Sequence, residues 1–345
     1  MSGFSEKLRI GVLGGGYWGR NVVRSLESIE GVKVKAICDP NKGNQEELRR
    51  LFPTVSLVSD PEELIADPQI DAICIVTPPS LHYLPAKVAL QAGKHVFVEK
   101  PMAMSYKEGL ELVELADQKG KVLFVDETFL YDPALLLVKE LVEEKAIGEI
   151  QYVVLERLGM GRIRCDSNVW WNSAPHDLSI IRFLLRQRPL SIAVTGKAFL
   201  QEELEDVVLA NLELEGGILV WVHLSWCYPK STASLTVIGE KGAIFYEGRF
   251  TKRQVILYSF KFGTRPTESV WGVPSPNLIP AQSKEEKTWI DFGKDEPLYL
   301  ALCAFIDAID NGKDVPSLGR YSLETLRLLD LGQLSLKNGG MKITL

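Results

Sequence analysis

The first third of the chain alternates short, wholly apolar β-rich runs with helical segments. Six such runs follow one another from Leu8 to about Phe129, and they read LRIGVLG, VKVKAICD, TVSLV, DAICIVTPP, KHVFVEKP and KVLFVDETF. Their apolar residues are continuous rather than alternating, which is typical of parallel strands covered on both faces. Helical stretches such as NVVRSLESI and PEELIAD lie between them. The pattern predicts right-handed βαβ units in an α/β fold whose N-terminal part is a doubly wound parallel sheet of Rossmann type.

The first of these runs ends in a glycine-rich turn of the kind that binds pyrophosphate. GVLGGGYWG contains G-x-G-x-x-G at Gly14, Gly16 and Gly19, with Tyr17 and Trp18 between the last two glycines. The first glycine permits a tight turn, the second lets backbone amides approach a pyrophosphate, and the third allows a helix to pack closely against the strand. Because the pattern follows a strand and precedes a helix, it predicts a dinucleotide site.

Asp39 ends the second run, twenty residues after Gly19. A carboxylate at this spacing can accept hydrogen bonds from the hydroxyls of an adenosine ribose, and it repels a 2′-phosphate. Pro40 and Asn41 follow it and offer no arginine to neutralise such a phosphate. The sequence therefore favours NAD over NADP as the cofactor. The alternative is that Asp39 only opens the turn DPN.

A second motif, VEKP, closes the fifth run. Glu99, Lys100 and Pro101 stand at the carboxyl end of a strand, which is the edge where doubly wound sheets bind their ligands. A lysine there can stabilise a developing alkoxide or hold a substrate hydroxyl. From these residues alone, the alternative is a solvated lysine in a turn.

These motifs resemble those of the Gfo/Idh/MocA oxidoreductases, a family that includes inositol and other sugar dehydrogenases. The resemblance rests on GVLGGGYWG, Asp39, VTPPSLH, VEKP, GKVLFVDETFLYDPALLLVKELVEEKAIGEI, APHDLSII and IGEKGAIFYEG, which cover nearly the whole chain in order. It implies a Rossmann domain followed by an α/β domain whose open, mostly antiparallel sheet carries the substrate site. Relatives tend to associate through that sheet, so a homo-oligomer, either a dimer or a tetramer, is expected.

The resemblance also implies roles for residues near the cofactor. It places Glu99 and Lys100 near the nicotinamide ribose, and Lys100 touches the substrate as well. Thr77, Pro78 and His82 of TPPSLH would line the cofactor channel. Without the resemblance, His82 is an ordinary polar residue near the start of a helix.

The chain changes character after Pro133. A helix, ALLLVKELVEE, precedes long β-rich runs that read QYVVLERLGM, LSIAVTGKAFL, DVVLANLELEGGILVWVHLSW, ASLTVIGE and GAIFYEG. Tight glycine turns between several of them predict an antiparallel sheet. Helices over residues 175–186 and 298–310 are expected beside this sheet, and a last helix is expected in SLETLRLLDLGQLSL.

These patterns divide the chain into two expected domains. Residues 1–129 would form an NAD-binding Rossmann domain, and residues 130–345 would form an α/β domain for substrate binding and oligomerisation. Residues 261–283 are rich in Pro, Ser and Gly. We expect them to form an irregular loop near the site or at an oligomer contact.

The candidate general base is His176, in the mostly apolar stretch NVWWNSAPHDLSI. Pro175 suits the first turn of a helix, and Ser173 could cap that helix. His176 would then lie where the positive end of the helix dipole disfavours protonation, and Asp177 would complement the same dipole. A neutral imidazole is a competent general base. The resembled family places a catalytic histidine here, although an isolated histidine of this kind is more often structural.

Asn172 departs from the family pattern, in which many relatives carry an aspartate four residues before the histidine. An amide can hold one tautomer of the ring by hydrogen bonding, but it cannot stabilise an imidazolium electrostatically. Three explanations stay open. The reaction tolerates a weaker base, Lys100 carries more of the proton transfer, or the protein has little dehydrogenase activity.

Three arginines precede the histidine and bear on the substrate: Arg157, Arg162 and Arg164. Cations gathered beside the expected site favour an anionic substrate, such as a nucleotide-linked sugar, a sugar acid or a sugar phosphate. Solvated arginines are the alternative. Trp170 and Trp171 could stack on a sugar face, although such tryptophans are more often core or subunit contacts.

Composition bears on the remaining classes of partner, on metal and disulfide sites, and on location. The formal net charge of −6 argues against nucleic acid or an anionic membrane as a partner. The five cysteines are scattered and show no ligand spacing, so neither a disulfide framework nor a metal site is expected. The start of the chain lacks the apolar core of a signal peptide, and no run has the length of a membrane span, so a cytoplasmic protein is expected.

The leading hypothesis is an NAD-dependent sugar dehydrogenase or reductase acting on a CH–OH group. In it, His176 is the general base, Lys100 stabilises the alkoxide, and Asn172 supports the histidine. Arg162 and Arg164 join these three residues in binding the substrate. The alternatives are a glycosidase that uses NAD transiently and a non-catalytic regulator that senses NAD and sugar.

Overall fold

The computed structural model describes residues 8–160, 163–249, 252–260, 262–266, 278–282 and 286–345. The chain divides into two compact units. The first unit comprises residues 1–132, 178–180 and 295–330, and the second comprises residues 133–177, 181–294 and 331–345. The expected boundary after residue 129 stays a prediction, and so does the cytoplasmic location. No helix in the described ranges is long and apolar enough to cross a membrane.

The first unit contains a parallel sheet whose six strands are all predicted runs. The sheet order is β3-β2-β1-β4-β5-β6, and every neighbouring pair is parallel. The order reverses between β1 and β4, so this sheet is doubly wound. The strands are β1 (Leu8–Leu13), β2 (Val32–Cys38), β3 (Ser56–Val58), β4 (Ala72–Ile75), β5 (His95–Glu99) and β6 (Leu123–Asp126).

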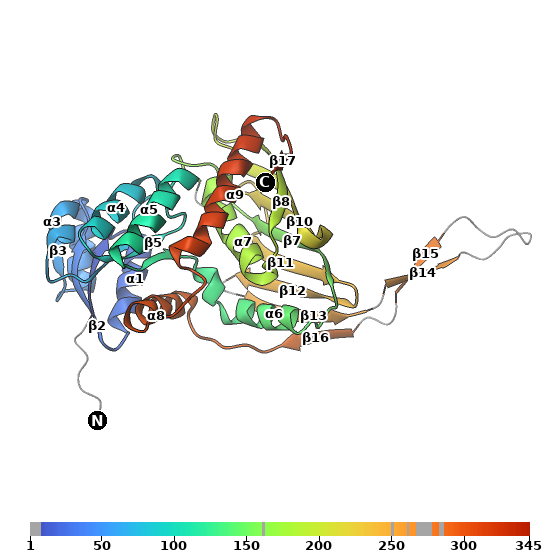
Figure 1. The fold of residues 1–345 in the computed structure, drawn as a ribbon, viewed down its shortest axis with the longest axis horizontal. Coiled ribbons are helices and arrows are strands. Elements are labelled where there is room, and N and C mark those ends of the chain that lie inside the picture. Colours follow the sequence, from blue (N-terminus) through green and yellow to red (C-terminus); the bar gives the residue numbers. More distant parts are fainter. Residues whose placement is uncertain (1–7, 161–162, 250–251, 261, 267–277, 283–285) are drawn as a thin grey trace, which may run out of the picture. The chain divides into compact units, whose positions relative to one another are not determined.

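Helices follow the strands of this sheet, as the alternation predicted (Figure 1). Side chains of Asn41, Asp60 and Ser105 cap the starts of three of them by accepting a backbone N–H. Gly120 ends the longest one in the left-handed conformation. The helices are α1 (Tyr17–Glu27), α2 (Lys42–Leu51), α3 (Pro61–Ala66), α4 (Tyr83–Gln91) and α5 (Tyr106–Lys119), with the 3-10 turns η1 (Pro79–Leu81) and η2 (Thr128–Tyr131).

A late helix, α8 (Pro297–Asp310), belongs to the first unit. The fully buried ring of Phe305 packs edge-on against Phe97 and Phe124, with ring centroids 5.6 Å apart in both pairs. The prediction that residues 298–310 pack beside the antiparallel sheet is therefore wrong. An apolar helix face does not specify which of two apolar sheets it covers, and here the aromatic rings of β5 and β6 provide the contact.

The second unit contains a nine-stranded sheet with the order β16-β13-β12-β11-β7-β10-β9-β8-β17. The predicted antiparallel pairing holds for every neighbouring pair except β7 and β10, which run parallel. Three of the strands, β13, β16 and β17, were not predicted. The strands are β7 (Ile150–Leu158), β8 (Pro189–Lys197), β9 (Val207–Leu214), β10 (Leu219–Ser225), β11 (Thr232–Gly239), β12 (Gly242–Arg249), β13 (Lys252–Ser259), β16 (Glu286–Ile290) and β17 (Ile343–Thr344).

Helices α6 (Pro133–Glu143), α7 (Val169–Leu185) and the end of α9 (Gly319–Lys337) pack in this unit (Figure 1). Helix α6 contacts β12 and β13. Ser335 of α9 accepts a hydrogen bond from the Val194 amide of β8 at 2.8 Å. Gly332 lets α9 approach Trp170 of α7, because a Cβ at that glycine would lie 2.2 Å from the indole.

The region expected to be an irregular loop contains two short antiparallel strands, β14 (Phe262–Pro266) and β15 (Leu278–Gln282). The prediction is wrong for these ten positions. The rest of residues 261–283 lies outside the described residues, and its suggested role at the site or at an oligomer contact stays a prediction.

Candidate functional site

The predicted phosphate-binding turn joins β1 to α1, and its geometry requires glycine. Gly14 has a φ of 106°, and a Cβ there would lie 2.5 Å from the Val76 carbonyl oxygen. A Cβ at Gly19 would lie 2.0 Å from the Gly14 carbonyl oxygen. At Gly16, the cap of α1, a Cβ would meet no atom within 4 Å. The first and third glycines are thus needed for packing, and the second borders open space at a helix N-terminus, where a phosphate fits.

Asp39 lies at the end of β2 beside this turn, and only 6% of it is exposed. Its Oδ2 accepts hydrogen bonds from the Gly15 amide at 2.8 Å and from Asn44 Nδ2 at 2.9 Å. Its Oδ1 accepts a bond from the Asn41 amide at 2.8 Å. Asp39 therefore holds the glycine turn as well as opening the turn that follows it, and its carboxylate stays next to the open space at Gly16.

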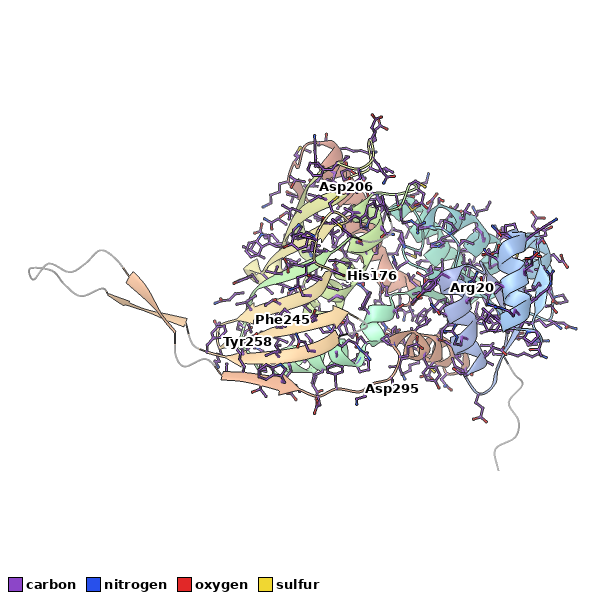
Figure 2. The ribbon with its side chains drawn as sticks, turned by 180° about the vertical axis from the view of Figure 1, so that it is seen from behind. Arg20, His176, Asp206, Phe245, Tyr258 and Asp295 are labelled. Atoms are coloured by element: carbon purple, nitrogen blue, oxygen red, sulfur yellow. The ribbon has the colours of Figure 1, made fainter. Side chains whose placement is uncertain are left out.

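Arg20 of α1 (Figure 2) shares a hydrogen-bond partner, Asn44, with the same carboxylate. Its Nη2 donates to Asn44 Oδ1 at 3.3 Å, and its Nη1 lies 2.7 Å from Glu47 Oε1. Sequence reasoning considered only the residues directly after Asp39 and did not find this cation. Its ion pair with Glu47 neutralises it at the place where the 2′-position of an adenosine ribose is expected.

The carboxyl ends of β5 and β6 bring a further group of polar side chains together. Glu99 stands directly opposite Asp126 in the parallel register. Asp126 accepts a hydrogen bond from Thr128 Oγ1 at 2.5 Å and one from Trp18 Nε1 at 3.4 Å. Burial, together with the neighbouring Asp126, raises the pKa of Glu99 well above its ordinary value. Lys100 follows Glu99 at the same sheet edge, as predicted.

Asp126 was not among the predicted site residues, although a signal was present. It ends a predicted strand, as Asp39 and Glu99 do, and the carboxyl ends of parallel strands meet at one sheet edge. The indole of Trp18 links the phosphate-binding turn to this edge, which gives Trp18 a place in the site. Tyr17, by contrast, is 66% exposed.

The TPPSLH segment follows β4 at the same edge of the sheet. Thr77 Oγ1 donates to the Leu81 carbonyl at 3.2 Å, and Pro78 is exposed at the start of η1. His82 has no exposed surface, and its ring nitrogens lie 2.7 Å from the Pro101 oxygen and 2.8 Å from the Thr77 oxygen. His82 thus ties the loop after β4 to the loop after Lys100. Direct contact of these three residues with a cofactor stays a prediction.

In the second unit, the helix that carries His176 (Figure 2) begins at Val169, not at Pro175. Its cap is Asn168, whose side-chain oxygen accepts the Trp171 amide at 3.1 Å and whose Nδ2 donates to Glu205 and Gln333. Pro175 lies inside the helix. The expectation that Ser173 caps the helix and that His176 lies in its first turn is therefore wrong.

The earlier start of α7 changes the physical argument for His176. Two turns of helix precede the ring, and the field of a helix terminus falls off within one turn, so the dipole does not govern its protonation. Asn172 and His176 lie one turn apart on one helix face. Both are partly exposed, whereas every other residue from Ser167 to Ile181 is buried. Between Ser167 and Ile181, the solvent-accessible residues are thus this amide and this imidazole.

Asp177 does not complement a helix dipole either. Its side chain is 3% exposed and lies 2.8 Å from Arg157 Nη2 on β7. Burial raises the pKa of Asp177, and the guanidinium of Arg157 opposes that effect. This ion pair joins α7 to the sheet and so fixes the position of the neighbouring His176.

The cations expected to favour an anionic substrate are partly neutralised. Arg157 pairs with Asp177, and Arg164 makes two hydrogen bonds to Asp166 at 2.8 and 2.7 Å. Arg162 lies outside the described residues. Trp170 is fully buried and Trp171 is 8% exposed, so both are core residues in this structure. A substrate role for Arg162 or Arg164 stays a prediction.

We expect Arg157→Met to lower the free energy of unfolding by about 3 to 5 kcal/mol, because it leaves the Asp177 carboxyl buried without its partner. The double variant Arg157→Met/Asp177→Leu should recover most of that loss, since a buried pair is often replaceable by apolar side chains. Urea unfolding of both variants measures this. A double variant as unstable as the single one would show that the pair is not the source of the loss.

Together, these features define a dinucleotide-binding oxidoreductase architecture. The first unit supplies the glycine turn, the Asp39 carboxylate and a buried acceptor, Glu99 Oε1, which has no hydrogen-bond partner among the described residues. These groups fit a dinucleotide. In the described part of the chain, no group of three or more His, Cys, Asp and Glu side chains could hold a metal ion.

Comparison with known families agrees with this architecture. Residues 8–127 match the family described as "Oxidoreductase family, NAD-binding Rossmann fold", and residues 135–245 match the "GFO/IDH/MocA C-terminal domain". The chain belongs to the Gfo/Idh/MocA oxidoreductases. The resemblance inferred from the motifs, the α/β fold class and the assignment to the oxidoreductases are thereby confirmed.

Individual relatives are dehydrogenases that differ in cofactor. The chain is 29% identical to the scyllo-inositol 2-dehydrogenase (NAD(+)) of Bacillus subtilis over 74% of this chain and 78% of the relative. It is 25% identical to the scyllo-inositol 2-dehydrogenase (NADP(+)) IolW of the same organism over 96% of this chain and 94% of the relative. The family thus supports an NAD(P)-binding site without distinguishing the two cofactors.

A solved structure shares the fold over almost the full length. UDP-N-acetylglucosamine 3-dehydrogenase from Acidithiobacillus ferrooxidans superimposes with a TM-score of 0.79 and is 22% identical. The match covers 96% of this chain and 97% of that protein.

Proposed function

We propose that the protein is an NAD-dependent dehydrogenase or reductase that moves hydride between a sugar-type CH–OH or keto carbon and the nicotinamide. The observation that carries the proposal is the open space at Gly16, at the N-terminus of α1, beside the carboxylate of Asp39. A phosphate accepts backbone amides there, and the carboxylate is placed to accept the ribose hydroxyls.

The choice of NAD over NADP rests on charge. The Asp39 carboxylate repels a 2′-phosphate, and Arg20, the cation beside it, is already paired with Glu47 at 2.7 Å. A phosphate would have to displace Glu47 to gain this arginine. NAD has no 2′-phosphate, so its binding requires no such displacement.

When bound, the nicotinamide accepts or donates the hydride. His176 takes the hydroxyl proton as a general base during oxidation and returns it during reduction. Lys100 holds the hydroxyl oxygen and stabilises the charge that develops on it. Asn172, one turn before His176 on the same face of α7, fixes the ring by hydrogen bonding. In this proposal Lys100 and His176 act on the same carbon–oxygen bond.

The substrate class follows from the relatives that act on inositols and on a nucleotide-linked amino sugar. The ion pairs of Arg157 and Arg164 weaken the argument for an anionic substrate. We therefore propose a polyhydroxylated ring as the recognised group, with or without a nucleotide or acid attached.

Incubation with NAD and a panel of inositols, free sugars, sugar acids and nucleotide-linked sugars tests the proposal. The expected result is absorbance growth at the NADH band with a subset of the panel. If no substrate produces NADH while NAD still binds, the dehydrogenase proposal fails. Release of an aglycone without net NADH would instead indicate the NAD-using glycosidase.

The regulator alternative rests on one observation, the amide at Asn172. We expect Asn172→Asp to raise kcat for the best substrate by about tenfold, because a carboxylate one turn away stabilises the imidazolium that forms. Asn172→Ala serves as the control for loss of the hydrogen bond alone. If Asn172→Asp leaves an inactive protein inactive, a non-catalytic role is favoured.

We further propose that the chain forms a homo-oligomer through the open face of the nine-stranded sheet. Apolar side chains gather on that face, where Tyr152 of β7 packs against Trp221 of β10 with ring centroids 5.4 Å apart. Leu209, Leu219 and Trp221 are 54%, 37% and 40% exposed. An apolar group of this kind is typical of a subunit interface.

Trp221→Lys is therefore expected to convert the oligomer to single chains, because it places a charge at the centre of the interface. Light scattering after size-exclusion chromatography measures the mass. Leu136→Lys, at an exposed leucine of α6 (42% exposed), is the matched control and should leave the mass unchanged. A wild-type protein that already has the mass of one chain contradicts the prediction.

A further inference from the structure

Two acidic side chains, Glu99 and Asp126, meet at the carboxyl edge of the first sheet. They end the neighbouring parallel strands β5 and β6 and stand directly opposite each other in the register. Asp126 is 1% exposed. Part of Glu99 reaches solvent, but its Oε1 is buried. Two carboxylates this close, away from water, cannot both be ionised at low cost.

The hydrogen bonds identify which of the two acids carries the proton. Asp126 accepts from Thr128 Oγ1 at 2.5 Å and from Trp18 Nε1 at 3.4 Å, so both its oxygens have donors. Glu99 has one backbone donor, the Lys100 amide, at 3.2 Å from Oε2. Two adjacent buried carboxyl groups are less costly with one shared proton than with two charges. Asp126, whose two oxygens both have donors, is the better stabilised anion, so the proton belongs on Glu99.

The charged groups that face Glu99 agree with this placement. Burial raises its pKa most, and the charge and hydrogen bond of Asp126 raise it further. The ammonium of Lys100 and the indole of Trp18 act in the opposite direction, and burial and Asp126 outweigh them. The direction of the pKa shift of Glu99 thus agrees with a proton on this carboxyl.

The place of this pair in the sheet relates it to the cofactor. The glycine turn lies at the end of β1 and Asp39 at the end of β2, so the adenosine half of a dinucleotide belongs over β1 and β2. The strand order reverses after β1, and the nicotinamide half then belongs over β4, β5 and β6. Glu99 Oε1, which has no partner among the described residues, lies at that end.

We propose that Asp126 is a positioning residue for the cofactor: it holds one proton together with Glu99 and so presents the Glu99 carboxyl as a neutral group at the nicotinamide end of the site. The inference rests on the proposed function for the identity of the ligand. The pair then carries one negative charge, which the ammonium of Lys100 balances.

This arrangement affects the choice between oxidised and reduced cofactor. The nicotinamide ring is positively charged in NAD+ and neutral in NADH. A second negative charge on the pair would favour NAD+ selectively and so hold back its exchange for NADH. We expect the ratio of NAD+ affinity to NADH affinity to rise by at least about tenfold with pH as the pair loses its proton.

The proton can be observed without cofactor. The infrared spectrum of the whole protein at pH 7 should contain the carbonyl stretch of a protonated carboxylic acid, and Glu99→Gln should remove it. In Asp126→Asn the band should titrate away at lower pH than in the wild type, because the charge that raises the pKa of Glu99 is gone. Glu114→Gln, at an exposed carboxyl of α5, is the control and should leave the band unchanged.

Cofactor binding supplies the second readout. Isothermal titration with NAD+ and with NADH should show that Glu99→Gln keeps most of the wild-type affinity and loses the pH-dependent part of the ratio. Glu99→Ala should bind at least about tenfold more weakly, because it cannot bond Asp126. Glutamine mimics the neutral acid, so equal losses of cofactor affinity in Glu99→Gln and Glu99→Ala would overturn the inference.

Failure of this inference differs from failure of the proposed function. An absent acid band, or a band that Asp126→Asn does not shift, overturns the shared proton even if NADH forms normally. A present band in a protein that produces no NADH with the substrate panel refutes the dehydrogenase and keeps the proton pair.

Discussion

Lys100→Met and His176→Gln are each expected to lower kcat by about 10² to 10⁴ while changing the dissociation constant of NAD by less than about threefold. Lysine supplies positive charge to an oxygen that becomes negative only as the C–H bond breaks, and removing such a group typically costs two to three orders of magnitude. Loss of a general base costs a similar factor. Stopped-flow measurement of NADH formation, together with titration of NAD into each variant, separates turnover from binding.

The double variant Lys100→Met/His176→Gln tests whether the two residues act on one bond. Groups that serve the same proton transfer give a double variant far less impaired than the product of the single losses. Lys107→Met and His223→Gln, which replace a lysine of α5 and a histidine of β10, are the controls and should retain wild-type turnover. Fully multiplicative losses would show that Lys100 and His176 serve separate steps.

The first sheet could be predicted because each of its strands is recognisable from its own residues. A strand covered on both faces has no polar side to alternate with, so runs such as AICI and HVFVE predict a parallel sheet directly. The glycine turn was predictable for the same reason. Gly19 is required by a contact within the turn and Gly14 by its positive φ, and both are local features. The contact of Gly14 with Val76, which follows β4, adds a constraint from a distant part of the chain.

The start of α7 could not be predicted because its cap depends on distant residues. Pro175 is a common first residue of a helix, and this local signal indicated the wrong start. The true cap, Asn168, donates to Glu205 at 2.6 Å and to Gln333 at 2.9 Å, and neither partner is visible in a local window. With this cap, the helix begins at Val169, and six helical residues precede Pro175.

Long-range pairing also explains the other misplaced features. Arg157 and Asp177 lie twenty residues apart and meet only because β7 passes beside α7. Sequence reasoning assigned one of them to the substrate and the other to a helix dipole. Phe305 packs on rings of β5 and β6 that precede it by about 200 residues. The residue types at the site were thus predictable from the sequence. The residues that they contact could be identified only from the folded structure.

Asp39→Ala is expected to weaken NAD binding by about 100-fold and to change NADP binding far less, which lowers the preference for NAD by a similar factor. The carboxylate offers charge-assisted hydrogen bonds to the ribose hydroxyls, and these are the strongest class of polar contact. The variant also loses the bonds to Gly15, Asn41 and Asn44, so a lower melting temperature is expected as well. Fluorescence titration with both cofactors measures the ratio, which an unspecific loss of stability would not change.

Arg20 determines how far the cofactor preference can shift from NAD toward NADP. Glu47 holds its Nη1 at 2.7 Å, so Asp39→Ala alone leaves the arginine neutralised. In Asp39→Ala/Glu47→Gln the guanidinium can turn to a 2′-phosphate, and NADP affinity should rise by a further factor of about ten. The exposed neighbour Glu46 provides the matched control, Glu46→Gln, which removes a charge from α2 without freeing Arg20. An unchanged NAD to NADP ratio in Asp39→Ala would mean that this carboxylate serves only the backbone turns around it.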